Sequence, residues 1–121
     1  MTIFVVDDDE TLRGFVKRWL AAHSLDVRTF EDGAEAVLAM AHFTPSLVLS
    51  DLDMPGLSGE DVARAAARLP RPPRVVLMSG DASRLERARG LAEATLEKPF
   101  SVTDLMSILE AAPGLRGCPT C

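Results

Sequence analysis

The stretch LVLSDLDMPG, residues 47–56, contains the pattern that decides the fold. Its first four residues, LVLS, lack the alternation of apolar and polar side chains that a strand with one solvent-facing side shows. This pattern predicts a strand buried on both faces, which is typical of a parallel sheet covered by helices on either side. The strand ends at Asp51, so the stretch also predicts a carboxylate at the carboxyl edge of the sheet, where open α/β sheets bind their ligands.

Strand-like and helical patterns alternate along the rest of the chain. Short apolar runs predict strands, and apolar residues spaced by three and four predict helices, as in the set Leu12, Phe15, Val16, Trp19 and Leu20. Ser83 and Ser101 are the expected N-caps of the last two helices. Five strand–helix units with right-handed crossovers predict an α/β fold with a doubly wound, five-stranded parallel sheet. The expected strands are residues 3–6, 26–29, 47–50, 74–78 and 95–97, and the expected helices are residues 10–22, 33–41, 59–69, 84–92 and 102–111.

The length of 121 residues and the hydrophobic content of 47% suit one domain with a single core. We expect this domain to span residues 1–112 and a flexible C-terminal tail to span residues 113–121. Cys118 and Cys121 both fall in that tail. Two thiols supply half of a four-thiolate zinc site, and no strand–helix unit surrounds them, so the pair predicts neither a metal site nor a redox motif.

The charge balance excludes several classes of partner. A net charge of −5 argues against binding to nucleic acid, which requires clustered basic residues. No run of about 18 uncharged apolar residues is present to span a membrane, and the chain opens directly into a strand-like segment rather than a signal peptide. We therefore expect a cytoplasmic protein that binds neither nucleic acid nor a membrane.

Polar residues follow four of the expected strands and could meet at one edge of the sheet. If the first and third strands are neighbours, the carboxylates of Asp7, Asp8 and Asp51 converge. Their repulsion raises a pKa or requires a cation, and a set of oxygen ligands suits Mg²⁺. Lys98 is a point charge suited to a phosphoryl oxygen, and Ser79 supplies a rotatable hydroxyl. The four fragments together predict a divalent-metal and phosphoryl site.

These motifs resemble the receiver domain of two-component response regulators, and the resemblance covers nearly the whole chain, roughly residues 2–112. It implies a flavodoxin-like (βα)5 fold with strand order 2-1-3-4-5. It also implies that Asp51 is the phosphoacceptor and that Asp8 and Asp51 bind Mg²⁺ directly. By the same resemblance, Asp7 acts largely through water and the backbone carbonyl of Asp53 is a further metal ligand.

The resemblance assigns roles to two more residues. It implies that the hydroxyl of Ser79 turns toward the phosphoryl group and that Lys98 neutralises the phosphate charge. A cis peptide bond to Pro99 commonly follows this lysine in the family, and X–Pro bonds adopt cis at small cost. Asp53 and Asp81, each two residues beyond a site residue, are expected to flank the entry of hydrolytic water and to affect phosphoryl lifetime more than folding.

Two features depart from the family's usual pattern. The position three before Lys98, usually Phe or Tyr, is Thr95, so the usual coupled rotation of hydroxyl and aromatic ring cannot operate. Only 18 residues, 80–97, separate Ser79 from Lys98, and Gly90 within this segment disfavours a helix. We therefore expect the fourth helix to be short, displaced or mobile.

The implied function is a phosphoacceptor switch that receives a phosphoryl group from a histidine kinase or a histidine phosphotransfer protein. The domain is expected to be a monomer or weak dimer, and not an enzyme beyond its own phosphorylation and dephosphorylation. With no effector domain expected, the signal should leave through contact with a downstream protein at the face formed by the fourth helix, fifth strand and fifth helix. The residues expected to supply this face are Leu85, Leu91, Leu105 and Ile108 for apolar area and Arg84, Arg87 and Arg89 for charge, although burial in the domain's own core is the favoured alternative for each leucine taken individually.

Two other functions stay open from the sequence. Asp51-Leu52-Asp53 also fits the D-x-D motif of aspartyl-nucleophile phosphatases of the haloacid dehalogenase type, with Asp53 as general acid. Against this function, the acidic pair lies at the N-terminus and no cap domain is present. An inert pseudo-receiver that only binds another protein is the second alternative, which Thr95 favours and the intact acidic site opposes.

Overall fold

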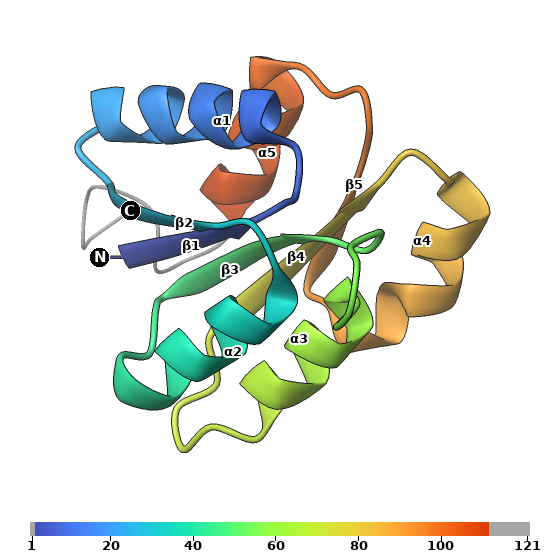
Figure 1. Cartoon of the computed structure of the whole chain (residues 1–121). Coiled ribbons are helices and arrows are strands. Elements are labelled where there is room, and N and C mark those ends of the chain that lie inside the picture. The colour runs from blue at the N-terminus through green and yellow to red at the C-terminus, as the bar shows by residue number, and fades with distance from the viewer. Residues whose placement is uncertain (1, 112–121) are drawn as a thin grey trace.

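The computed structural model describes residues 2–111, so the predicted tail with Cys118 and Cys121 lies outside the described residues. Five strands alternate with five helices along the chain (Figure 1). The strands are β1 (Thr2–Val6), β2 (Asp26–Phe30), β3 (Leu47–Asp51), β4 (Arg74–Ser79) and β5 (Ala94–Glu97). The helices are α1 (Glu10–Ala22), α2 (Gly33–His42), α3 (Gly59–Ala67), α4 (Ala82–Ala88) and α5 (Val102–Ala111), with a short 3₁₀ helix, η1 (Arg89–Leu91), after α4.

The five strands form one parallel sheet in the order β2-β1-β3-β4-β5, which confirms the predicted α/β fold and strand order. The register pairs Val6 with Ser50 and Asp51 with Met78. The strand order reverses between β1 and β3, so the ends of these two strands form the crevice where ligands bind in such sheets. The predicted neighbourhood of the first and third strands is therefore confirmed.

Helices cover both faces of the sheet (Figure 1). Val16 and Leu20 of α1 and Leu105 of α5 pack against one face, and α2, α3 and α4 pack against the other. Every residue of β1 and β3 is buried, as predicted for a strand without alternation, whereas the edge strand β2 is partly exposed. Within residues 2–111, no helix has the length and apolar character needed to cross a bilayer.

The fourth helix differs from its predicted bounds. It begins at Ala82 because Asp81, not Ser83, is the N-cap: the Asp81 side chain accepts hydrogen bonds from the backbone N–H groups of Ser83 and Arg84. The helix has only seven residues and gives way to η1, where Gly90 lies, which confirms the expectation of a short helix. Ser101 accepts from the N–H of Asp104 as predicted, and Asp104 accepts in return from the N–H of Ser101.

The start of α3 packs directly against the end of β3. A Cβ atom on Gly59 would lie 2.4 Å from the backbone oxygen of Asp51, so only glycine permits this approach. The loop before it contains Gly56 with a φ of 76°, a conformation that side chains rarely adopt. Ser58 and Asp61 form a capping box that begins α3. These contacts position the loop that follows Asp51.

Candidate functional site

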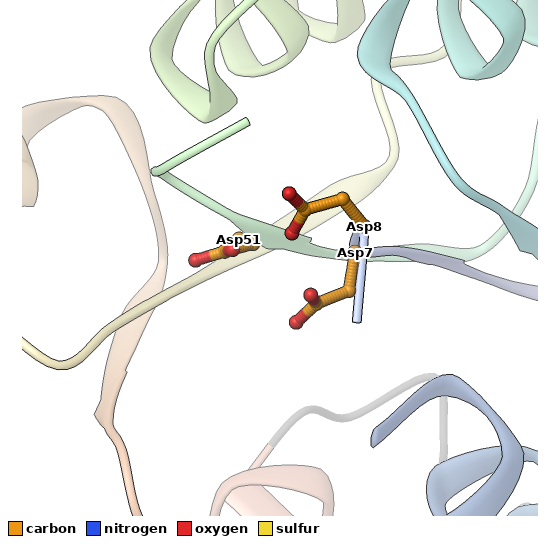
Figure 2. Close-up of side chains that lie close together, drawn as sticks. All are labelled: Asp7, Asp8 and Asp51. Carbon is orange, nitrogen blue, oxygen red and sulfur yellow. The ribbon is translucent and has the colours of Figure 1, made fainter. Parts of the chain in front are cut away.

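Three carboxylates converge at the carboxyl edge of the sheet (Figure 2). Asp51 is the last residue of β3, and Asp7 and Asp8 directly follow the neighbouring β1. Each residue offers a carboxylate oxygen, and these oxygens lie within 4.8 Å of one another. Asp7 is fully buried and Asp51 nearly so, whereas Asp8 is exposed. The predicted juxtaposition is confirmed, with one carboxylate open to solvent and two inside the protein.

Lys98 reaches this cluster from the end of β5. Its Nζ atom lies 2.8 Å from Oδ2 of Asp7 and 3.4 Å from Oδ2 of Asp51. The peptide bond between Lys98 and Pro99 is cis, as predicted. Asp7 is held further by the backbone N–H of Asp9, which donates to its Oδ1 at 2.9 Å. The amine and the buried carboxylates therefore form one compact charged cluster.

The electrostatics of the cluster favour a bound cation. Burial, reinforced by the charge of Asp7, raises the pKa of Asp51 to about 6 even though Lys98 opposes the shift. Burial alone would lower the pKa of Lys98, but the hydrogen bond and charge of Asp7 outweigh it and raise that pKa above its usual value. Three clustered carboxylates with one amine leave excess negative charge, and their oxygen donors are those that Mg²⁺ prefers. The residues present therefore fit a magnesium ion.

Ser79 lies close to the cluster but its hydroxyl is directed elsewhere. It is fully buried at the end of β4, and its Oγ donates to Oδ2 of Asp53 at 2.9 Å. The same Oγ accepts from the backbone N–H of Asp81 at 3.0 Å. In this arrangement the Ser79 hydroxyl is bound to Asp53, two residues beyond Asp51.

Arg84 belongs to this site, although it was predicted from the sequence to lie on an outward binding face. Its guanidinium forms an ion pair with Asp53 and a second with Glu60 at 2.9 Å. It also donates to the backbone oxygen of Leu52 at 3.3 Å. The prediction that Arg84 adds charge to an outward binding face is therefore wrong. The sequence signal for this contact is an arginine in the first turn of a helix that lies one loop after Ser79. That signal can be used only if the helix begins at Ala82, two residues before its predicted start.

The remaining predicted features have mixed outcomes. Leu85 and Leu105 are buried in the domain's own core, so the prediction that they supply apolar binding surface is wrong, whereas Leu91 and Ile108 remain half-buried. Asp81 is the N-cap of α4, so its replacement should also affect folding, and the expectation that it affects phosphoryl lifetime more than folding stays a prediction. Thr95 is half-buried and lines a hollow of about 320 Å³ between η1 and β5.

Comparisons with known proteins agree with this geometry. Residues 3–110 match the family described as the response regulator receiver domain. The DNA-binding transcriptional regulator NtrC of Escherichia coli K12 is 34% identical over 114 residues, which are 91% of this chain and 24% of that protein. The chain thus spans about a quarter of that relative, and about half of the phosphate regulon regulator PhoB of Rhizobium meliloti, at 32% identity over 90% of this chain.

Solved structures show the same fold. The receiver domain of a response regulator from Bermanella marisrubri is 30% identical, with a TM-score of 0.83, and the match covers 92% of this chain and 96% of that one. The response regulator TrrA of Thermotoga maritima, solved with Mg²⁺ and BeF, is 26% identical, with a TM-score of 0.83 over 92% and 97% of the two chains. The fold, the acidic cluster of Asp7, Asp8 and Asp51, and the match over residues 3–110 show that the chain belongs to the receiver domains of two-component response regulators, the phosphoacceptor modules of these signalling systems.

Proposed function

We propose that Asp51 is the residue of this receiver domain that accepts the phosphoryl group. The observation that carries the proposal is the burial of Asp51 beside Asp7 and Lys98, because a carboxylate in this environment has both a cation site and an amine within reach. Of the carboxylates in residues 2–111, only Asp7 and Asp51 contact Lys98. Asp7 already holds Lys98 at 2.8 Å and the N–H of Asp9, which leaves Asp51 as the available nucleophile.

A magnesium ion would be held by Asp8 and Asp51 directly, by Asp7 largely through water and by the backbone carbonyl of Asp53. When bound, it would neutralise negative charge on the transferring phosphoryl group. Asp8 is the solvent-exposed member of the cluster, so the ion can keep waters that phosphoryl oxygens replace. The excess negative charge of the three carboxylates supports this assignment.

The chain's own residues then account for the transfer. A carboxylate oxygen of Asp51 attacks the phosphorus of a phosphohistidine in line, the new O–P bond forms, and the electron pair of the broken P–N bond returns to the imidazole. Lys98 already lies 3.4 Å from Oδ2 of Asp51, and its charge stabilises the oxygens of the transferred group. Ser79 would leave Asp53 and donate to one of those oxygens.

The phosphodonor would be a histidine kinase or a histidine phosphotransfer protein that docks beside Lys98. A hollow of about 360 Å³ there is lined by Asp9, Leu12, Phe15, Lys98, Pro99 and Phe100. Phe15 is a large apolar side chain with an exposed fraction of 36%, so it offers contact area to a partner helix next to the reacting atoms.

Output would pass through protein contact at α4, β5 and α5, now limited to the residues that remain accessible there, such as Leu91 and Ile108. The domain would not act as an enzyme beyond its own phosphorylation and dephosphorylation, and a cytoplasmic location remains a prediction.

The phosphatase alternative loses its general acid, since the Asp53 carboxylate is engaged by Ser79 and Arg84. The inert pseudo-receiver is a possible outcome of the following experiment.

The test is phosphoryl uptake from acetyl phosphate in the presence of Mg²⁺, followed by intact mass. The wild-type domain should gain one phosphoryl group, Asp51→Asn should gain none, and chelation of the metal should abolish uptake. Asp26→Asn is the matched control, because Asp26 lies at the opposite edge of the sheet, where it accepts from Thr2. No uptake by the wild-type domain would support the inert module, and equal uptake by Asp51→Asn would overturn the assignment.

A further inference from the structure

Arg84 connects α4 to the two segments that follow the proposed acceptor. One nitrogen of its guanidinium pairs with Asp53, and the other contacts Glu60 of α3 at 2.9 Å and the backbone oxygen of Leu52 at 3.3 Å. Arginine can make these contacts together because its donors form a rigid planar fork. The α4 helix is therefore attached to the acceptor loop by a side chain as well as through β4.

Asp53 links Arg84 to the hydroxyl that the proposed function requires. Its carboxylate accepts from Ser79 through one oxygen and from Arg84 through the other. A hydroxyl has a single hydrogen to donate, so Ser79 cannot donate to Asp53 and to a phosphoryl oxygen on Asp51 at the same time. The contact between Ser79 and Asp53 therefore competes with phosphoryl binding.

The backbone at the start of α4 depends on the same hydroxyl. The N–H of Asp81 donates to Oγ of Ser79, and the Asp81 side chain accepts from the N–H groups of Ser83 and Arg84. A rotation of Ser79 that breaks its contact with Asp53 thus changes the surroundings of the Asp81 cap and of Arg84. Arg84, Asp53, Ser79 and Asp81 form a closed set of contacts, which we name the Arg84 latch.

We propose that Arg84 is a positioning residue that acts through Asp53 to hold the Ser79 hydroxyl in the phosphoryl-free arrangement. The latch must open when the acceptor is occupied, so it lowers the affinity of the domain for a phosphoryl group and couples occupancy to the start of α4. This inference rests on the proposed function. It also supplies a route from the acceptor to α4 that does not need an aromatic ring at position 95.

The exposure of the latch sets the size of its effect. The side chains of Arg84 and Asp53 are 30% and 50% exposed, and ion pairs at such positions contribute little. Arg84 is itself neutralised by Asp53 and Glu60, so its charge adds little attraction for an anion at Asp51. Removal of Arg84 should therefore strengthen phosphoryl binding by about two- to fivefold.

The experiment is a titration of the Mg²⁺-loaded domain with beryllofluoride, followed by amide chemical shifts. Arg84→Ala and Arg84→Gln should bind beryllofluoride about two- to fivefold more tightly than wild type. Arg64→Ala, which removes the same charge from an exposed ion pair on α3, should bind like wild type. In an Asp53→Ala background, Arg84→Ala should have no further effect, because the two residues act in series.

Three results would overturn the latch. They are weaker binding by both Arg84 variants, unchanged binding, or a gain that persists in the Asp53→Ala background. Failure of the proposed function is separable, since wild type would then not bind beryllofluoride at all. In that case the latch is tested by the amide chemical shifts of Ser79, Gly80 and Asp81 in the ligand-free domain. The latch predicts that Arg84→Ala changes these shifts and that Arg64→Ala does not. Unchanged shifts in Arg84→Ala would contradict the latch.

Discussion

Asp51 and Asp53 are two residues apart and occupy opposite environments. The Asp51 side chain is 6% exposed and lies beside Asp7 and Lys98, and burial raises its pKa to about 6. The Asp53 side chain is 50% exposed and contacts Ser79 and Arg84. The buried aspartate holds charge at an energetic cost, which suits a metal and a phosphoryl group, whereas the exposed one makes weak contacts that can rearrange. One loop thus combines a preformed reaction site with an adjustable set of contacts.

The largest effect on stability should come from removing the cation of the buried cluster. Lys98→Ala leaves Asp7 and Asp51 buried without their amine, and we expect a loss of about 3 kcal/mol in the free energy of unfolding of the metal-free domain at pH 7. Urea unfolding measures this loss. Lys17→Ala, on the exposed surface of α1, is the control. A loss below about 0.5 kcal/mol would show that the cluster is not buried as described.

A gain in stability should follow from removing the buried charge itself. The pKa of Asp51 rises from 3.8 to about 6 on folding, so the folded state binds its proton more tightly. The favourable contribution of the protonated Asp51 side chain to the free energy of unfolding is therefore fully present below pH 3.8. This contribution is lost as the pH rises through about 6. Asp51→Asn should stabilise the metal-free domain by about 2–3 kcal/mol at pH 7.

The pH dependence separates this explanation from a general effect of the substitution. The difference between Asp51→Asn and wild type should shrink as the pH falls from 7 to 4. Mg²⁺ should stabilise wild type and not Asp51→Asn. A constant difference between pH 4 and pH 7 would contradict the raised pKa.

Much of the buried half of the site could be predicted from the sequence. The uninterrupted LVLS run indicates a central strand, and Asp7, Asp8, Asp51 and Lys98 follow strands whose carboxyl ends share one edge. The topology of a parallel sheet brings such residues together without reference to side-chain detail. For this reason the acidic cluster and the sheet order were predictable.

The exposed half was not predictable in the same way. Ser83 and Asp81 are both good N-cap residues two positions apart, and the choice of Asp81 moves the start of α4 and the direction of Arg84. Leu85 and Leu105 carry the same side chain as Leu91, yet only tertiary packing determines that they are buried. Long-range ion pairs such as Arg84 with Asp53 depend on these placements.

Substitutions at two glycines compare the packing around the buried half of the site with the packing around its exposed half. Gly59→Ala places a Cβ 2.4 Å from the backbone oxygen of Asp51 and should cost about 1–3 kcal/mol. Gly90→Ala meets no atom within 4 Å and should be neutral or stabilise the domain by less than about 1 kcal/mol. Thermal unfolding of the two variants compares them directly, and equal effects would argue against the difference in packing.

A moderate effect, larger than that of Gly90→Ala, concerns the cap of α4. Asp81→Ala should lower the Tm by about 5 °C, because two backbone N–H groups lose their acceptor. Ser83→Ala should have a smaller effect, since its hydroxyl donates to Asp81 and accepts a long contact of 3.5 Å from Arg87, but satisfies no backbone N–H group of the helix. A larger loss for Ser83→Ala than for Asp81→Ala would restore Ser83 as the cap.

The most direct test of the central claim is chemical mapping of the modified residue. Treatment of the domain with acetyl phosphate and Mg²⁺, followed by borohydride, reduces an aspartyl phosphate to homoserine, and peptide mass spectrometry locates the change. We expect homoserine at position 51 alone, dependent on Mg²⁺ and absent when acetyl phosphate is omitted. Homoserine at position 53 or position 8, or at no position, would contradict the assignment of Asp51 as the phosphoacceptor.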